Sequence, residues 1–223
     1  MVELIFSHIP KAAGKSIVLG LKQYYGADAV AEDYNVRVDG ASDPGAAVYV
    51  DEQEYQRHAE TFVRTTVSPK TKVIAGHFPF HKYRSFFPRA NQVCCIREPI
   101  ERLWSTYWYW KQVGPTTSPI QALVATGKLN FKKLIGHPMM RNQQVDHFLS
   151  GARWDEWPEH DPEGVFVMCH EYLEAGWKML GSTLGAKSRW PDLPHINKTD
   201  HKEEISEEEW IEAFRLNGRD YDL

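Results

Sequence analysis

Residues 7–16 read SHIPKAAGKS, and they stand between an apolar run at residues 2–6 and an apolar pattern with helical spacing that begins at Ile17. The run predicts a buried strand, and the spaced pattern predicts a helix. A strand, a short loop of small and basic residues and a helix N-terminus together favour phosphate binding. Successive backbone N–H groups point at the anion, the helix dipole attracts it, and lysines add full charge. The sequence therefore predicts a phosphorylated ligand.

This loop matches the P-loop of nucleotide triphosphatases only in its second half. Gly14, Lys15 and Ser16 occupy the last three positions of G-x-x-x-x-G-K-[ST], but Ile9 stands at the first glycine position. A branched side chain there hinders a positive φ and crowds the terminal phosphates of a triphosphate. From the loop alone, an ATP or GTP site and an ordinary strand-to-helix turn with a capping serine both remain open.

Length and composition exclude several classes of protein. The 223 residues suffice for one core, so we expect a single domain over residues 1–223. A net charge of −4 gives no global basic field for nucleic acid, so a local patch must hold any anionic ligand. No apolar run approaches the roughly 20 residues of a membrane span, and no signal peptide precedes the first strand. We therefore expect a cytoplasmic protein without a membrane span. The three cysteines lack metal-ligand spacing, and we expect them to be buried thiols.

The rest of the chain alternates between apolar runs and helical patterns. Residues 26–50 show little periodicity and predict a loop or small excursion. Further strands are predicted at residues 72–75, 91–96 and 164–168, and helices at 51–65, 99–111, 118–127, 141–149, 171–181 and from 206 onward. This alternation predicts an α/β fold, a P-loop-like three-layer fold with a mostly parallel central sheet flanked by helices. Ligands of such sheets lie beyond the carboxyl ends of the strands, where residues 7–15, 76–81 and 97–105 begin.

A second basic segment, residues 97–107, reads REPIERLWSTY. Arg97 leaves a predicted strand, and Ser105 lies about two turns into the helix that follows. A guanidinium and a hydroxyl at this spacing can hold one phosphate, the arginine through two bonds and the serine through one. The alternative is a capped helix with a surface arginine.

Together the two segments resemble the sulfotransferases that use 3′-phosphoadenosine 5′-phosphosulfate (PAPS), and in particular the core of the heparan and chondroitin types. Residues 8–16, HIPKAAGKS, are similar to the family's 5′-phosphosulfate loop, H-I-P-K-T-A-G-T-S. Residues 97–107 match the family's 3′-phosphate segment, R-x-P-x-x-R-x-x-S-x-Y, at every fixed position. The resemblance implies PAPS as co-substrate, adenosine 3′,5′-bisphosphate as product, no metal, and a small-molecule or glycan hydroxyl as acceptor. It assigns cofactor binding to Lys11, Ala12, Ala13, Gly14, Lys15, Ser16, Arg97 and Ser105.

Gly76-His77, before an aromatic-rich loop, resembles the segment that bears the catalytic histidine of the uronyl 2-O-sulfotransferases. This implies that His77 is the general base, a role that suits a side chain titrating near neutrality. The alternative is a loop histidine bonded to a backbone carbonyl. The charge that grows on the leaving phosphate would be stabilised by Lys11, or by Lys15.

Two later segments resemble further parts of the family. Residues 195–199, HINKT, are similar to a loop that closes over the cofactor, which adds Lys198 and Thr199 to the cofactor site. Arg141, Asn142 and Gln143 fall in a region similar to the family's R-N-x-Q-x-x-x-L-x-G. With His81, these three are the acceptor-site candidates. His81 follows His77 at i+4, but no third ligand stands nearby to complete a zinc site.

The chain also departs from the family. Ala12 and Lys15 replace the usual threonines, which removes hydroxyl donors and adds a charge. The membrane anchor and stem of the Golgi relatives are absent, which indicates a soluble, bacterial-type enzyme. Two other functions remain open. A kinase or other P-loop phosphotransferase needs Mg²⁺ and an acidic residue at a strand end, where the predicted strands offer His77 and Arg97. A module that binds adenosine bisphosphate without turnover would account for the lost threonines.

Overall fold

The computed structural model describes residues 1–34, 52–115, 118–149, 165–186, 189–194, 196 and 204–222. At its centre lies a five-stranded parallel sheet in the order β2-β3-β1-β4-β5. The strands are β1 (Leu4–Ser7), β2 (Val30–Asp33), β3 (Val73–Gly76), β4 (Asn91–Ile96) and β5 (Val165–Cys169). Ser7 is in register with both Gly76 and Cys94, so β1 and β3 end at one level and β4 runs two residues further, to Ile96.

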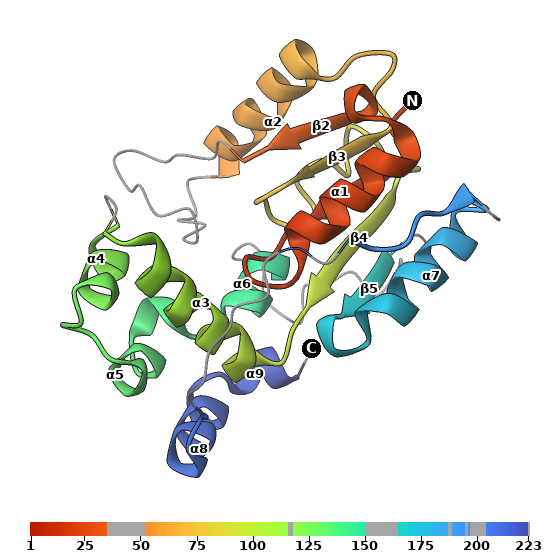
Figure 1. Cartoon of the computed structure of the whole chain (residues 1–223). Coiled ribbons are helices and arrows are strands. Elements are labelled where there is room, and N and C mark those ends of the chain that lie inside the picture. The colour runs from red at the N-terminus through yellow and green to blue at the C-terminus, as the bar shows by residue number, and fades with distance from the viewer. Residues whose placement is uncertain are drawn as a thin grey trace.

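Helices cover both faces of this sheet (Figure 1). On one face, α1 (Gly14–Tyr25) and α7 (Leu173–Thr183) bury Ile17, Leu21 and Trp177 against β1, β3 and β4. On the other face, α2 (Glu52–Thr66) and the segment after β3 cover Ile5 and Ile74. Alternate residues of β1 and β3 thus enter two separate cores. The expected three-layer α/β fold with a parallel sheet is confirmed.

A third group of helices lies beyond the carboxyl ends of the strands (Figure 1). Its core contains Leu103 and Trp104. The centre of the Trp104 ring lies 4.4 Å from the centre of the Phe131 ring. The helices at this end of the molecule are α3 (Pro99–Val113), α4 (Pro119–Ala125), α5 (Phe131–Ile135), α6 (Gln143–Leu149), α8 (Glu207–Leu216) and α9 (Gly218–Tyr221). Short 3₁₀ turns occur at Ala27–Ala29, Pro138–Met140 and His170–Tyr172.

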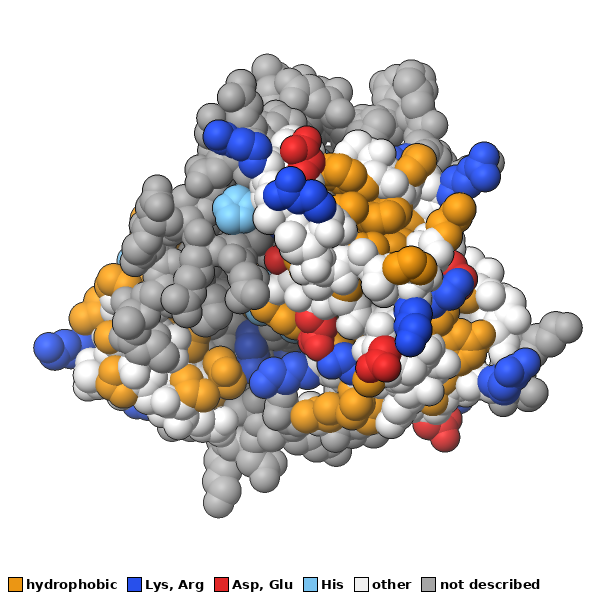
Figure 2. Space-filling model, turned by 90° about the horizontal axis from the view of Figure 1, so that it is seen from above, with side chains coloured by type: hydrophobic (Ala, Val, Ile, Leu, Met, Phe, Trp, Pro, Cys, Tyr) orange, Lys and Arg blue, Asp and Glu red, His pale blue; other side chains and the backbone are white. Residues whose placement is uncertain are grey.

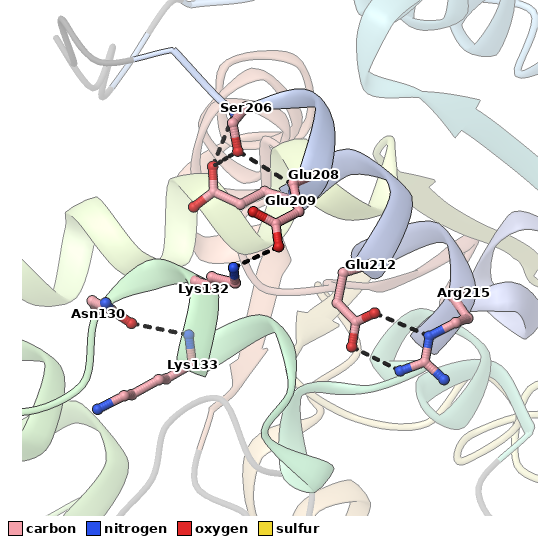
Figure 3. Close-up of polar contacts among 8 residues, drawn as sticks. All are labelled: Asn130, Lys132, Lys133, Ser206, Glu208, Glu209, Glu212 and Arg215. Carbon is pink, nitrogen blue, oxygen red and sulfur yellow. Dashed lines mark hydrogen bonds and ion pairs between the residues drawn. The ribbon is translucent and has the colours of Figure 1, made fainter.

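Polar contacts fix α8 against α5 (Figure 3). The Ser206 side chain accepts a hydrogen bond from the backbone of Glu209, and the Glu209 carboxylate accepts one from the backbone of Ser206, which makes a capping box. Lys132 of α5 forms an ion pair of 2.6 Å with Glu208. Because both of its side chains are exposed, this pair contributes little stability and mainly orients the two helices.

The structure differs from the sequence-based expectation at one strand and two helices. Residues 26–50 were expected to hold no strand, but β2 lies there and pairs with β3. Its sequence, VAED, is short and partly acidic, so the strand is set by its pairing rather than by its own pattern. The short helices α5 and α9 were also not expected. Cys94 and Cys95 are buried as expected, whereas Cys169 is exposed. Among the described residues, no helix is both long and apolar enough to cross a membrane.

Asp33, the last residue of β2, forms a buried ion pair. Its carboxylate accepts hydrogen bonds from the Lys82 ammonium at 2.7 Å and from the Tyr83 hydroxyl at 2.6 Å. Burial lowers the pKa of Lys82, and the charge of Asp33 opposes that shift. The pair therefore ties the end of β2 to the segment that follows β3.

Replacing Asp33 with asparagine should destabilise the fold strongly, because the Lys82 ammonium would stay buried without its counter-ion. We expect Asp33→Asn to lower the free energy of unfolding by about 3–5 kcal/mol, measured by urea denaturation. The matched control is Glu32→Gln on the same strand, which breaks the partly exposed pair with Lys22 and should cost less than about 1 kcal/mol. Equal losses in the two variants would contradict this account.

Candidate functional site

The loop between β1 and α1 takes a strained backbone conformation. Lys11 has φ 68° and Ala13 has φ 59°, both in the left-handed region that residues other than glycine rarely adopt. Ile9, at the first glycine position of a P-loop, is instead buried in the core. Each left-handed residue costs about 1–2 kcal/mol, and such strain is typical of functional sites. The sharp turns aim the loop across the N-terminus of α1.

The N-terminus of α1 is left open for an anion. Ala13 occupies the N-cap position and offers no side-chain hydrogen bond, and the first turn holds no acidic residue. The N–H groups of this turn therefore lack the capping acceptor that most helices supply. Ser16, in the same turn, is buried, and its hydroxyl accepts a hydrogen bond from the backbone N–H of Ile196 at 3.3 Å. The late segment around Ile196 thus reaches the first loop.

Gly14 is required because the His8 ring lies directly against its α-carbon, and not because of its backbone angles. A β-carbon at this position would overlap the imidazole ring of His8. The backbone N–H of His8 in turn donates to the carbonyl of Gly76 at 2.7 Å, which fixes the loop against the end of β3. The glycine therefore allows His8 to pack directly over the start of α1.

Positive side chains meet at this helix N-terminus. Burial, together with the charges of Arg97 and Lys15, lowers the pKa of Lys11 to about 8. The Lys11 ammonium lies 4.1 Å from the centre of the Tyr109 ring. Figure 2 shows Lys and Arg side chains at the lower centre of one face, with acidic side chains among them. Burial is the largest cause of the lowered pKa of Lys11, and the neighbouring cations add to it.

Arg97 reaches this loop from the end of β4. Its Nη1 donates to the carbonyl of Lys11 at 3.4 Å, and its Nη2 donates to the Glu101 carboxylate at 3.3 Å. Its Nε, which is buried, has no hydrogen-bond partner among the described residues. Only 15% of the side chain is exposed, so the alternative of a surface arginine is wrong. The guanidinium thus keeps donor capacity for a ligand.

Ser105 lies in α3, four residues after Glu101 and four before Tyr109, a spacing that places side chains along one side of a helix. Arg97 precedes this helix and bonds to Glu101. Arg97 and Tyr109 both contact Lys11, so this face is turned toward the first loop. Ser105 is itself buried. The α3 face and the start of α1 therefore enclose one cationic site.

Histidine and tyrosine side chains gather beside the loop. His77 follows β3, and its backbone N–H donates to the carbonyl of Asp33 at 3.1 Å. Its ring centre lies 4.4 Å from that of His8 and 4.9 Å from that of Tyr34. His147 of α6 is buried nearby: burial lowers its pKa to about 3, and the charge of His77 contributes to that shift. The structure thus places His77 next to the loop, as the sequence predicts.

Three of the residues expected to bind the acceptor form hydrogen bonds outside the first loop. Arg141 donates to the carbonyl of Gly136 at 2.8 Å, and Gln143 donates to the carbonyl of Met139 at 2.7 Å. The side-chain oxygen of Asn142 accepts a hydrogen bond from the backbone of Asp220 at 3.4 Å. His81 lies exposed in the turns after β3. The side chains of Arg141, Asn142 and Gln143 therefore bond to backbone groups, and their role toward an acceptor stays a prediction. Lys198 and Thr199 lie outside the described residues.

Two residues at the site were not predicted. Gln144 is buried and contacts the backbone of Arg97, whereas the sequence analysis selected its neighbour Gln143. The glutamine of the R-N-x-Q pattern falls at position 144, so the pattern itself indicates Gln144 rather than Gln143. Tyr34, which contacts His8 and His77, follows the unexpected strand β2 and carried no signal in the sequence.

β2 also places an acidic residue, Asp33, at a strand end, which the sequence analysis did not expect. Its carboxylate accepts hydrogen bonds from Lys82 and Tyr83, so it is directed toward the core. Among the described residues, no group of three or more His, Cys, Asp or Glu side chains is placed to hold a metal ion.

No known sequence-family profile and no curated protein sequence matches this chain. Among solved structures, a sulfotransferase from Alicyclobacillus acidocaldarius is similar over 99% of this chain and 93% of its own, with 15% identity and a TM-score of 0.48. The mouse sulfotransferase SULT7A1, complexed with PAP, is similar over 96% of this chain and 62% of its own, with 13% identity and a TM-score of 0.47. Both likenesses are too distant to assign a function.

Substitutions at two adjacent loop positions should have opposite effects on stability. Ala13→Gly removes left-handed strain, and we expect it to raise the free energy of unfolding by about 1 kcal/mol. Gly14→Ala has to displace the His8 ring, so it should lower the melting temperature of the protein. Thermal unfolding of the two variants measures both effects. A stable Gly14→Ala protein with an unchanged loop would show that His8 does not pack there as described.

Proposed function

We propose that this chain transfers the sulfuryl group of PAPS to a hydroxyl of a small-molecule or glycan acceptor. The observation that carries the proposal is the uncapped N-terminus of α1, where the charges of Arg97 and Lys15, with burial, lower the pKa of Lys11. PAPS carries anionic groups at the 5′ and 3′ positions. A site with two separate anion-binding parts, the first loop and the α3 face, suits such a ligand.

Each part of the site takes one end of the cofactor in this proposal. The N–H groups of Gly14, Lys15 and Ser16 bind the 5′-phosphosulfate at the start of α1, with Ala12 and Ala13 forming the turn before it. Arg97 binds the 3′-phosphate through its free donor capacity, and Ser105 adds a hydroxyl from the next turns of α3. Lys198 and Thr199 close over the cofactor. The bond from Ile196 to Ser16, two residues before Lys198, supports this closure.

Lys11 is the better candidate for stabilising the leaving phosphate. Its side chain is half-buried among Arg97 and Tyr109, whereas Lys15 is exposed. A charge in a partly water-excluded site stabilises a developing anion more than the same charge in water. A bound anion also favours the protonated form of Lys11, against the effect of burial.

His77 is the general base of the proposed reaction. It takes the proton of the acceptor hydroxyl while the oxygen attacks sulfur, and the bond between sulfur and the bridging oxygen breaks to release adenosine 3′,5′-bisphosphate. The rings of His8 and Tyr34 pack against His77 and orient it beside the loop. The acceptor approaches from the His77 side of the site, and His81, Arg141, Asn142 and Gln143 stay candidates for contacting it.

The kinase alternative receives no support from these contacts. Asp33 is the acidic residue at a strand end, and Lys82 and Tyr83 already hold its carboxylate. Ile9 is buried where a P-loop would place its first glycine. A module that binds adenosine bisphosphate without turnover uses the same cofactor site, so only a rate measurement separates it from an enzyme.

Ligand binding tests the proposed function. Adenosine 3′,5′-bisphosphate should raise the melting temperature of the protein, and ATP with Mg²⁺ should raise it much less. Arg97→Met should reduce this rise strongly, because the 3′-phosphate loses its charged partner. Arg64→Met, which removes an exposed arginine from α2, is the control and should leave the rise unchanged. An equal rise with ATP and Mg²⁺ would favour a phosphotransferase instead.

The role of His77 has a kinetic test. With radiolabelled PAPS and a panel of hydroxyl acceptors, His77→Ala should lower turnover by roughly 10²- to 10⁴-fold. Binding of adenosine 3′,5′-bisphosphate should change little, because the base faces the acceptor. His58→Ala, which removes an exposed histidine from α2, serves as the control. Full turnover in His77→Ala would leave His77 as a loop histidine with a structural role.

A further inference from the structure

Gln144 holds the backbone of Arg97 through two hydrogen bonds. The N–H of Arg97 donates to the Gln144 Oε1 at 2.8 Å, and the Gln144 Nε2 donates to the carbonyl of Arg97 at 2.8 Å. β4 ends at Ile96, one residue earlier, so the backbone of Arg97 leaves the sheet ladder. Buried backbone groups need partners, and the planar amide of Gln144 supplies both. Gln144 is itself only 1% exposed, which makes these bonds inaccessible to water.

The side chain of Arg97 is held less firmly than its backbone. Its two side-chain bonds, to Lys11 and Glu101, measure 3.4 and 3.3 Å, which is longer than usual for an arginine. Its Nε has no partner among the described residues. The direction of the guanidinium therefore depends on how the peptide of Arg97 is oriented, and Gln144 fixes that peptide.

The helix that carries Gln144 is anchored by the C-terminal part of the chain. The N–H of Val145 donates to the Asp220 carboxylate at 2.9 Å, and the N–H of Asn142 donates to the side-chain oxygen of Asn217 at 3.0 Å. Both acceptors are buried. These bonds fix the start of α6, so the Gln144 amide has a firm support from which to orient Arg97.

We infer that Gln144 is a positioning residue for recognition of the 3′-phosphate. The inference rests on the proposed function, in which Arg97 binds that phosphate. The side-chain amide of Gln144 bonds Arg97 and does not touch the cofactor in this account, so its effect is expected only with nucleotides that carry a 3′-phosphate. The 5′ end of the nucleotide lies in the first loop, where Gln144 has no part.

Two nucleotides that differ only in the 3′-phosphate, adenosine 3′,5′-bisphosphate and adenosine 5′-monophosphate, test this inference by calorimetry. Gln144→Met removes both bonds at a similar side-chain volume. Affinity for the bisphosphate should fall about tenfold or more, and affinity for the monophosphate should stay within about twofold. Adding Gln144→Met to an Arg97→Met variant should cost little more, because Gln144 acts only through Arg97.

The control is Gln121→Met, since Gln121 is also buried and also donates to a backbone carbonyl, that of Gly114 at 3.1 Å. It should leave the preference between the nucleotides unchanged even if it lowers stability. Gln144→Glu keeps an acceptor for the N–H of Arg97 but loses the donor to its carbonyl, so it should give an intermediate preference. This variant decides the question if Gln144→Met folds poorly.

Several outcomes overturn the inference. If the wild type prefers the bisphosphate and the Gln144 variants keep that preference, Gln144 does not act through Arg97. If both nucleotides weaken equally in the Gln144 variants, its role is only structural. If the wild type binds both nucleotides equally, Arg97 does not read a 3′-phosphate. The proposed function then fails first, and this inference fails with it.

Discussion

Burial of positive charge at Lys11, close to Lys15 and Arg97, is the constraint around which this site is organised. Burial and the two neighbouring charges lower the pKa of Lys11 to about 8, and the start of α1 has neither a side-chain cap nor an acidic residue to offset them. Left-handed backbone at Lys11 and Ala13 adds strain to the same loop. An anion bound at this loop would offset part of this positive charge. Preorganisation of this kind favours binding, because the ligand does not have to assemble the charges.

The parallel sheet explains why distant segments meet at this site. Ser7, Gly76 and Cys94 share one level of the register, so His8 and His77 leave their strands at the same height, and Arg97 follows β4 two residues further on. Buried contacts then fix each exit: Asp33 holds the segment after β3 through Lys82, and Gln144 holds the backbone of Arg97. The positions of His77 and Arg97 thus each depend on buried side chains of another segment.

Local patterns allowed much of this molecule to be predicted from its sequence. Apolar runs predicted β1, β3, β4 and β5, and the two basic segments predicted Lys11, Gly14, Arg97 and Ser105 at one edge of the sheet, where the structure places them. β2 could not be predicted, because VAED becomes a strand only through its pairing with β3. The contacts of Asp33 and Tyr34 likewise join segments far apart in the chain, and no spacing in the sequence indicates them, whereas the R-N-x-Q pattern does indicate Gln144. Residues that belong to a short sequence pattern could be predicted, whereas residues whose role depends on tertiary contacts could not.

A crystal structure with adenosine 3′,5′-bisphosphate tests the central claim, that the three cations form a bisphosphate site. The account predicts the 5′-phosphate at the N–H groups of Gly14, Lys15 and Ser16, with the Lys11 ammonium nearby. It predicts the 3′-phosphate against Arg97 and Ser105, with the bonds between Gln144 and Arg97 unchanged. A nucleotide bound away from the start of α1, or one whose 3′-phosphate makes no contact with Arg97, would contradict the account.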